Sequence, residues 1–264
     1  MITMGVDVGS TTTKAVVLDG TVERAAQLPP SGALPAQTAA ALYGETLARA
    51  GLQPADVAVI AVTGYGRRLA GFGDIVLTEI KACAAGVRHR VPAGAAVHTI
   101  IDVGGQDTKV LALGDDGEIE DFSMNDKCAA GTGRFLEVLA QKLGLSYAEF
   151  VAEALQSETL LQMNATCAVF AESEVVGLLA RGEHKRDIAA AAHHAVAARI
   201  SSMIRRVARR AGYWFVGGGA LNQALVRALQ EALNAPVHVP PDAQFMVALG
   251  AAVAAAEKRA AAGG

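Results

Sequence analysis

The stretch Asp7–Leu18 reads DVGSTTTKAVVL, and a near copy of it, DVGGQDTKVLAL, occupies Asp102–Leu113. Aligned without gaps, the two stretches share six of their twelve residues, and the second begins 95 residues after the first. In each stretch, runs of aliphatic and β-branched residues flank a short polar segment that contains glycine. This pattern predicts a strand, a tight turn and a second strand. The sequence therefore predicts one structural unit built twice.

The two turn segments have the chemistry of an anion site. Glycine permits the backbone angles with which successive N–H groups point at one anion, and serine and threonine add hydroxyl donors. An aspartate, Asp7 or Asp102, precedes each turn, and a lysine follows it. One such turn alone would suit an ordinary hairpin, whereas two in register favour a nucleotide. GxxxxGK[ST] is absent and no GxGxxG follows a predicted strand, which excludes P-loop and dinucleotide folds.

The spacing of the repeat predicts the domain organisation. An interval of 95 residues is too long for a solenoid unit. We therefore expect two homologous lobes that face each other across a nucleotide cleft. The first lobe is expected over residues 1–96 and the second over 97–244, and a helix at about 245–260 is expected to pack back on the first lobe.

Hydrophobic periodicity and capping residues predict the elements between these landmarks. Asp187 is expected to be the N-cap of a long helix, and the chain from the second hairpin to Tyr213 is expected to be helical. Four arginines late in that helix, Arg205, Arg206, Arg209 and Arg210, fit a solvated face better than a partner site, so we assign them no role. The predicted helices are 36–51, 79–87, 134–143, 187–211 and 222–233, and the predicted strands are 57–62 and 214–216.

Composition narrows the function classes. The 264 residues are 52% hydrophobic, which is enough for a large core. A net charge of −3 gives no general attraction to nucleic acid or to an anionic membrane, so we expect neither as a partner. The N-terminus lacks the features of a secretory signal, and we expect a cytoplasmic protein. Three cysteines cannot all pair in disulfides, so free thiols or metal ligands are expected.

The duplicated turns, together with Gly217-Gly218-Gly219-Ala220-Leu221-Asn222, resemble the actin, Hsp70 and sugar-kinase superfamily over nearly the whole chain. The resemblance implies an α/β fold in which two ribonuclease-H-like lobes clamp ATP and Mg²⁺. It implies Mg²⁺ binding through water by Asp7 and Asp102, and orientation of the attacking water by Gln106 or Asp107. The remaining implied contacts are Gly9, Ser10, Thr11, Thr12 and Lys14 with the β- and γ-phosphates, Gly104 and Gly105 with the γ-phosphate, and Gly217, Gly218 and Asn222 with the adenosine.

Two cysteines lie in distinctive segments, NDKCAAGTGRFLE at Asn125–Glu137 and ATCAVFAESEV at Ala165–Val175. Both Cys128 and Cys167 come shortly before a predicted helix, where backbone N–H groups and the helix dipole favour a thiolate. Core filler is the ordinary role of a lone cysteine, but this position is a poor one for an inert thiol.

These two segments, with Thr63-Gly64-Tyr65-Gly66-Arg67, resemble the activators (component A) of 2-hydroxyacyl-CoA dehydratases, which are related to the ATPase subunits of benzoyl-CoA reductase. The resemblance implies a homodimer in which Cys128 and Cys167 of both subunits hold one 4Fe–4S cluster. The number of cysteines agrees, since two from each of two subunits give the four thiolates that such a cluster takes. At Cys83 the family usually has histidine, and we leave Cys83 out of the cluster.

The implied function is ATP-dependent electron transfer in anaerobic metabolism. A flavodoxin or ferredoxin would supply the electron, and ATP hydrolysis would drive its delivery to a 2-hydroxyacyl-CoA dehydratase or related CoA-ester reductase. An alternative is a small-molecule kinase of the same fold with structural cysteines. A third reading is an Hsp70-like nucleotide switch without redox chemistry.

Overall fold

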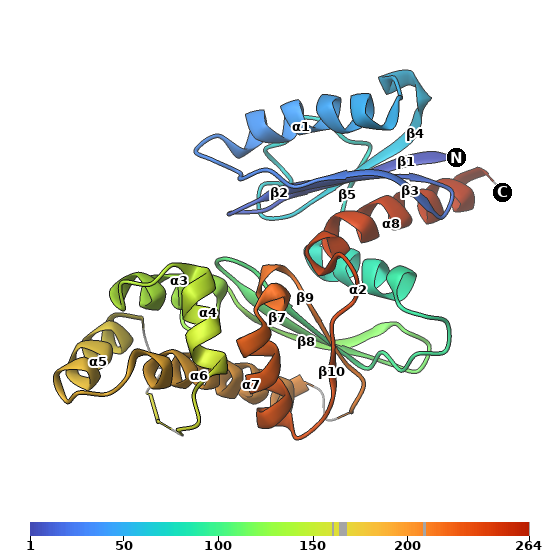
Figure 1. Ribbon diagram of the computed structural model, residues 1–264. Helices are drawn as coiled ribbons and strands as arrows, with labels where there is room; N and C mark the ends of the chain where they lie inside the picture. The colour runs from blue at the N-terminus through green and yellow to red at the C-terminus, as the bar shows by residue number, and fades with distance from the viewer. Residues whose placement is uncertain (160, 164–167, 208–209, 264) are drawn as a thin grey trace. The chain divides into compact units, whose positions relative to one another are not determined.

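A computed structural model describes residues 1–159, 161–163, 168–207 and 210–263. The chain forms two compact units. Unit 1 joins Met1–Ala95 to the C-terminal part of the chain from Pro240 onward, and unit 2 is Ala96–Val239. Each unit is a mixed sheet covered by helices, and each is described here by itself (Figure 1).

Unit 1 has a five-stranded sheet in the order β3-β2-β1-β4-β5. β1 pairs antiparallel with β2, β2 pairs antiparallel with β3, and β4 runs parallel to β1 and to β5. Helix α1 covers one face of the sheet, α8 covers the other, and α2 packs on α8 (Figure 1). The elements are β1 Ile2–Val8, β2 Thr13–Asp19, β3 Val22–Gln27, α1 Pro35–Ala50, the short helix η1 Pro54–Asp56, β4 Val57–Thr63, β5 Ile75–Val76, α2 Glu79–Arg90, η3 Ala243–Phe245 and α8 Met246–Gly263.

Unit 2 repeats this topology. Its sheet order, β8-β7-β6-β9-β10, matches that of unit 1 strand for strand, with the same alternation of antiparallel and parallel pairs. The predicted α/β fold class and its duplication are confirmed. The elements are β6 Thr99–Val103, β7 Thr108–Leu113, β8 Ile119–Asn125, α3 Gly133–Lys142, α4 Tyr147–Leu155, α5 Ala168–Ala180, α6 Lys185–Val207, β9 Tyr213–Val216, η2 Gly218–Leu221, α7 Gln223–Leu233 and β10 Val237–His238.

Two sequence-based expectations are wrong. The chain between the second hairpin and Tyr213 is not all helical, because Ile119–Asn125 forms β8, an edge strand of the unit 2 sheet. Asp187 does not cap α6; it lies within the first turn, where its Oδ1 accepts a hydrogen bond from Ser157 Oγ at 2.8 Å. The mostly polar sequence of β8 gave no strand signal, because a strand of an antiparallel pair can leave one face in solvent.

Helices α2 and α8 approach each other unusually closely in unit 1. A Cβ atom on Gly86 would overlap the backbone oxygen of Met246, and one on Gly250 would overlap that of Ala82. Gly5 of β1 gives α8 the same close approach to the sheet. Glycine therefore sets the packing distance of the C-terminal helix.

No helix in the described ranges has the length and apolarity needed to cross a membrane.

Candidate functional site

The first turn lies between β1 and β2 of unit 1. Asp7 is the penultimate residue of β1, is only 4% exposed, and faces Lys14 across the ladder. Lys14 Nζ donates a hydrogen bond to Asp7 Oδ2 at 2.9 Å, while the lysine side chain remains 17% exposed. The predicted aspartate and lysine of this turn therefore form an ion pair at its base.

Ser31, a fully buried residue that sequence reasoning missed, fixes the shape of this turn. Its Oγ donates to Gly9 O at 2.6 Å and lies 2.9 Å from Thr13 Oγ1, and its backbone N–H donates to Thr11 O at 2.9 Å. No sequence motif marks Ser31, because it lies far along the chain from the turn. Within the described part of the chain, no hydrogen bond involves the side-chain hydroxyls of Ser10, Thr11 and Thr12. These hydroxyls can therefore serve an anion.

The second turn lies between β6 and β7 of unit 2, and its lysine is held differently. Lys109 is buried, and its Nζ lies 2.6 Å from Asp107 Oδ2 and 3.8 Å from Asp102 Oδ2. Gly104 N–H donates to Asp107 O at 2.9 Å, which closes the turn. Gln106 is exposed at its tip. Of the two residues predicted to orient water, Asp107 is thus engaged by Lys109 and Gln106 faces solvent.

A glycine packs against the strand-end aspartate in each unit. Gly64 follows β4 with φ +94°, and a Cβ there would lie 2.5 Å from Asp7 Oδ1. Gly217 follows β9 with φ +82°, and a Cβ there would lie 2.5 Å from Asp102 Oδ1. Both the left-handed backbone and the contact exclude a side chain. The segment Thr63–Arg67 in unit 1 is therefore the structural counterpart of the Gly217 loop in unit 2.

The predicted adenosine residues lie where β9 leads into α7. Gly217 and Gly218 form the loop, and Asn222 is the N-cap of α7, with Oδ1 accepting from Leu225 N–H at 3.0 Å. Asn222 Nδ2 donates to Tyr147 Oη and to His193 Nε2, each at 2.9 Å. Both polar atoms of the buried Asn222 side chain therefore have protein partners, which makes it a positioning residue for this loop.

His193 completes the buried network. Its Nδ1 lies 2.7 Å from Ala189 O, so Nδ1 carries the proton and Nε2 accepts from Asn222. Burial lowers the pKa of His193 to about 4, and burial also raises the pKa of Tyr147. The imidazole is therefore neutral at physiological pH and serves as a hydrogen-bond acceptor.

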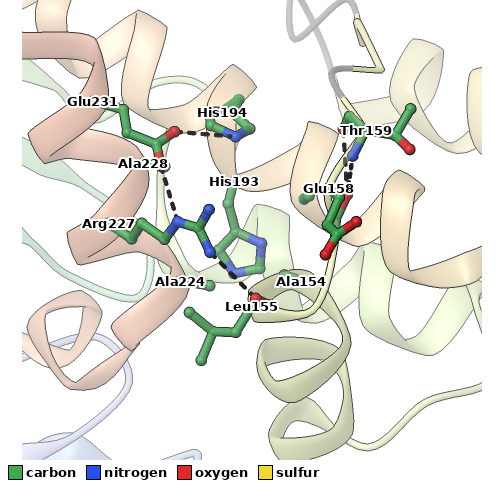
Figure 2. Close-up of a pocket in the computed structure, with 12 residues that line it drawn as sticks. Ala154, Leu155, Glu158, Thr159, His193, His194, Ala224, Arg227, Ala228 and Glu231 are labelled. Atoms are coloured by element: carbon green, nitrogen blue, oxygen red, sulfur yellow. Dashed lines mark hydrogen bonds and ion pairs between the residues drawn. The ribbon is translucent and has the colours of Figure 1, made fainter.

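A small cavity of about 100 Å³ lies beside this network, between α4, α6 and α7 (Figure 2). Two of its lining side chains, Arg227 and His194, contact the carboxylate of a third, Glu231. Arg227 Nε lies 2.9 Å from Glu231 Oε1, His194 Nε2 lies 3.6 Å from Glu231 Oε2, and Arg227 donates to Leu155 O at 3.2 Å. The volume suits a few waters rather than a nucleoside.

Cys128 lies half-buried in the loop between β8 and α3. Asn125 Nδ2 donates to Cys128 O and to Ala130 O, each at 2.9 Å, and Thr132 Oγ1 donates to Ala129 O at 2.7 Å. The loop is thus braced by its own side chains, and the accessible thiol suits a metal ligand better than core filler.

The Cys128 loop is bonded directly to the second turn. Gly133 N–H donates to Gly104 O at 3.0 Å, and Arg134 N–H donates to Gly105 O at 2.9 Å. Thr108 Oγ1 donates to Gly131 O at 2.6 Å. Two residues predicted to contact the γ-phosphate are therefore hydrogen-bonded to the start of α3, the helix that follows Cys128.

The other two cysteines have different positions. Cys167 lies outside the described residues, and α5 begins directly after it at Ala168. Cys83 is fully buried in α2 of unit 1. No group of three or more His, Cys, Asp or Glu side chains in the described ranges could hold a metal ion.

Comparisons with known proteins give these features a context. The chain is 40% identical over 257 residues to the 2-hydroxyisocaproyl-CoA dehydratase activator of Clostridioides difficile, covering 96% of this chain and 94% of the relative. Component A of the Acidaminococcus fermentans (R)-2-hydroxyglutaryl-CoA dehydratase matches with a TM-score of 0.92 and 38% identity, over 98% of this chain and 99% of that one. The activator from Clostridium difficile with bound ADPNP matches with a TM-score of 0.90 and 37% identity, over 99% and 97%.

A more distant likeness confirms the fold alone. A ROK-family glucokinase from Streptomyces griseus matches with a TM-score of 0.61 at 14% identity, over 97% of this chain and all of the other. The predicted sugar-kinase architecture is thus confirmed. A family model, the BadF/BadG/BcrA/BcrD ATPase family, matches residues 4–255. With the dehydratase activators as its relatives over nearly its full length, the chain belongs to the BadF/BadG/BcrA/BcrD ATPase family.

Proposed function

We propose that this protein is an ATP-dependent electron-transfer activator. It hydrolyses ATP, acts as a homodimer, and delivers a low-potential electron to a 2-hydroxyacyl-CoA dehydratase or a related CoA-ester reductase. The relatives named above as dehydratase activators support this partner. A flavodoxin or ferredoxin is the proposed electron donor.

The nucleotide chemistry belongs to the two turns. Asp7 and Asp102, both nearly buried at strand ends, suit water-mediated binding of Mg²⁺. Lys14 and the hydroxyls of Ser10, Thr11 and Thr12 bind the β- and γ-phosphates. Gln106 orients the attacking water, assisted by Asp107. The backbone groups assigned to the nucleotide are Gly9, Gly104, Gly105, Gly217 and Gly218, beside the α7 cap Asn222.

The thiols fit an iron–sulfur cluster by their donor chemistry. Cys128 offers an accessible soft ligand in a braced loop, and with Cys167 it gives two thiolates per chain. A two-fold dimer then supplies the four that a 4Fe–4S cluster takes. Such a cluster, when bound, takes up and releases one electron.

The three hydrogen bonds between the second turn and the Cys128 loop carry this proposal. Any displacement of Gly104 and Gly105 by a γ-phosphate pulls on the N–H groups of Gly133 and Arg134. Gly133 also packs closely on the turn, because a Cβ there would lie 3.1 Å from Gly104 O, a tight contact. Occupancy of the ATP site is thereby communicated to Cys128 through backbone contacts within one unit.

The decisive experiment measures iron, sulfide and oligomeric mass on protein purified without oxygen. Wild type is expected to be a dimer with about four irons. Cys128→Ser is expected to lose the iron while ADPNP still binds, because the thiol lies outside the turns. Cys83→Ser is the matched control and should keep the iron, since that thiol is buried in α2.

An iron-free monomer that hydrolyses ATP would refute the proposal and leave a small-molecule kinase as the working function. Loss of ADPNP binding in Cys128→Ser would show that the thiol supports the nucleotide site instead.

A further inference from the structure

A groove of about 510 Å³ runs between β8 and the second half of α6 in unit 2. It differs from the cavity of Figure 2, where Arg227 has a carboxylate partner, Glu231. The lining combines two arginines with uncharged polar and apolar residues, with no carboxylate among the described residues that form it. The residues that matter here are Ser123, Met124 and Asn125 of β8 and Arg199, Ser202 and Arg206 of α6.

Among the described residues, the positive charge of the groove has no protein counter-charge. Arg199 and Arg206 lie on one face of α6, since they are two helical turns apart. Within the described ranges, neither guanidinium has a hydrogen bond or an ion pair. Neighbouring arginines differ: Arg205 donates to Ser201 and Ser202, and Arg210 pairs with Asp115. In a chain of net charge −3, this is a local positive site.

The groove adjoins the loop of Cys128. Asn125 both lines the groove and holds the Cys128 carbonyl. Arg199 packs its alkyl stem on Gly131 of the same loop, where a Cβ would lie 2.7 Å from Arg199 Cδ. Met124 is 44% exposed at the rim and offers an adaptable apolar contact. A protein seated in this groove would therefore touch the residues that brace Cys128.

We propose that this groove docks an acidic electron-carrier protein, the donor in the proposed function, on which this inference rests. Guanidinium groups bind surface carboxylates in a bidentate manner, and an uncompensated pair steers an acidic partner to this face. Electron tunnelling falls steeply with distance, so a donor must dock close to the thiol-bearing loop. The groove meets both requirements.

The test measures binding of purified flavodoxin, a carrier rich in surface carboxylates, to the anaerobically purified dimer at about 0.1 M and 1 M salt. Arg206→Glu is expected to weaken the Kd about tenfold at low salt. The difference should disappear at high salt, where the Debye length falls from about 10 Å to about 3 Å. Arg205→Glu is the matched control: it makes the same charge change one residue away, outside the groove.

Iron content and oligomeric mass are measured on every variant. A tenfold loss confined to Arg206→Glu, in an iron-loaded dimer, supports the proposal. If both variants bind flavodoxin equally well, or are weakened equally, the docking proposal is overturned. Iron in those dimers would still support the proposed function. A monomeric Arg206→Glu also overturns it, because the groove would then belong to the subunit contact. A wild type without iron refutes the proposed function itself.

Discussion

The two duplicated turns have the same backbone plan and hold their lysines in different ways. In unit 1, Lys14 bonds to the strand-end Asp7 and keeps part of its side chain at the surface. In unit 2, Lys109 is buried between Asp102 and a second carboxylate, Asp107, which occupies the position of Thr12. The difference between Thr12 and Asp107 thus leaves Lys14 partly exposed, whereas Lys109 is buried between two carboxylates.

The turns also differ in what lies behind them. Ser31 braces the first turn from a distant loop of its own unit. The second turn is braced by the segment that carries Cys128. The outer contacts of the two turns have therefore diverged, and in the described part of the chain it is the second turn that is hydrogen-bonded to a thiol-bearing loop.

The largest predicted effect is on stability. Lys109→Met leaves two carboxylates without their cation and is expected to cost about 3–5 kcal/mol of unfolding free energy. Lys14→Met should cost much less, because Lys14 is more exposed and balances one aspartate. Urea denaturation of both variants measures the difference. Equal losses of unfolding free energy would contradict the different roles inferred for Lys109 and Lys14.

A second prediction converts the first turn into the second. Thr12→Asp should capture Lys14 as Asp107 captures Lys109, and it adds negative charge beside the phosphates. ATP hydrolysis is expected to fall about 100-fold in kcat, the scale of losing one charge-stabilising group. Steady-state phosphate release checks this, with Thr12→Ser as control. Undiminished kcat in Thr12→Asp would mean that Lys14 does not act on the phosphates.

The smallest predicted effect is a pH dependence of stability in unit 2. His193 of unit 2 has a folded-state pKa of about 4, against 6.5 for an unperturbed imidazole, so the unfolded chain binds the proton more tightly. Stability from this group is fully present above pH 6.5 and is lost as pH falls toward 4. Between pH 7 and 5 the loss is about 2 kcal/mol.

Hydrogen exchange at pH 7 and pH 5 follows each unit separately. Unit 2 should loosen at the lower pH, and His193→Asn should flatten that dependence. An unchanged pH dependence in this variant would assign the acid response to other groups.

Much of the fold was readable from the sequence, for identifiable reasons. The repeated DVG turns predicted both hairpins, and Gly51 and Asn222 marked helix ends at the positions where the structure has them. Strand β8 was not predicted, because its sequence does not alternate between apolar and polar residues. Ser31 was not predicted, because only folding brings it to Gly9.

The residue types of the candidate site could be predicted from the sequence, but the ion pairs between them could not. The strand-end aspartates and the lysines stood out in the alignment of the two turns. That Asp107 would hold Lys109 could not be derived, because a lysine two residues away can reach either carboxylate. The bonds from Gly104 and Gly105 to the Cys128 loop join segments whose proximity no local pattern encodes.

The close packing of α8 has a consequence for biosynthesis. Unit 1 is assembled from both ends of the chain, and its sheet is covered on one face by a helix that begins at Met246. On the ribosome, unit 2 is complete before α8 emerges, while the apolar surface of β1 and β4 still lacks its cover. Strands β1 and β4 are thus made long before the helix that covers one face of their sheet.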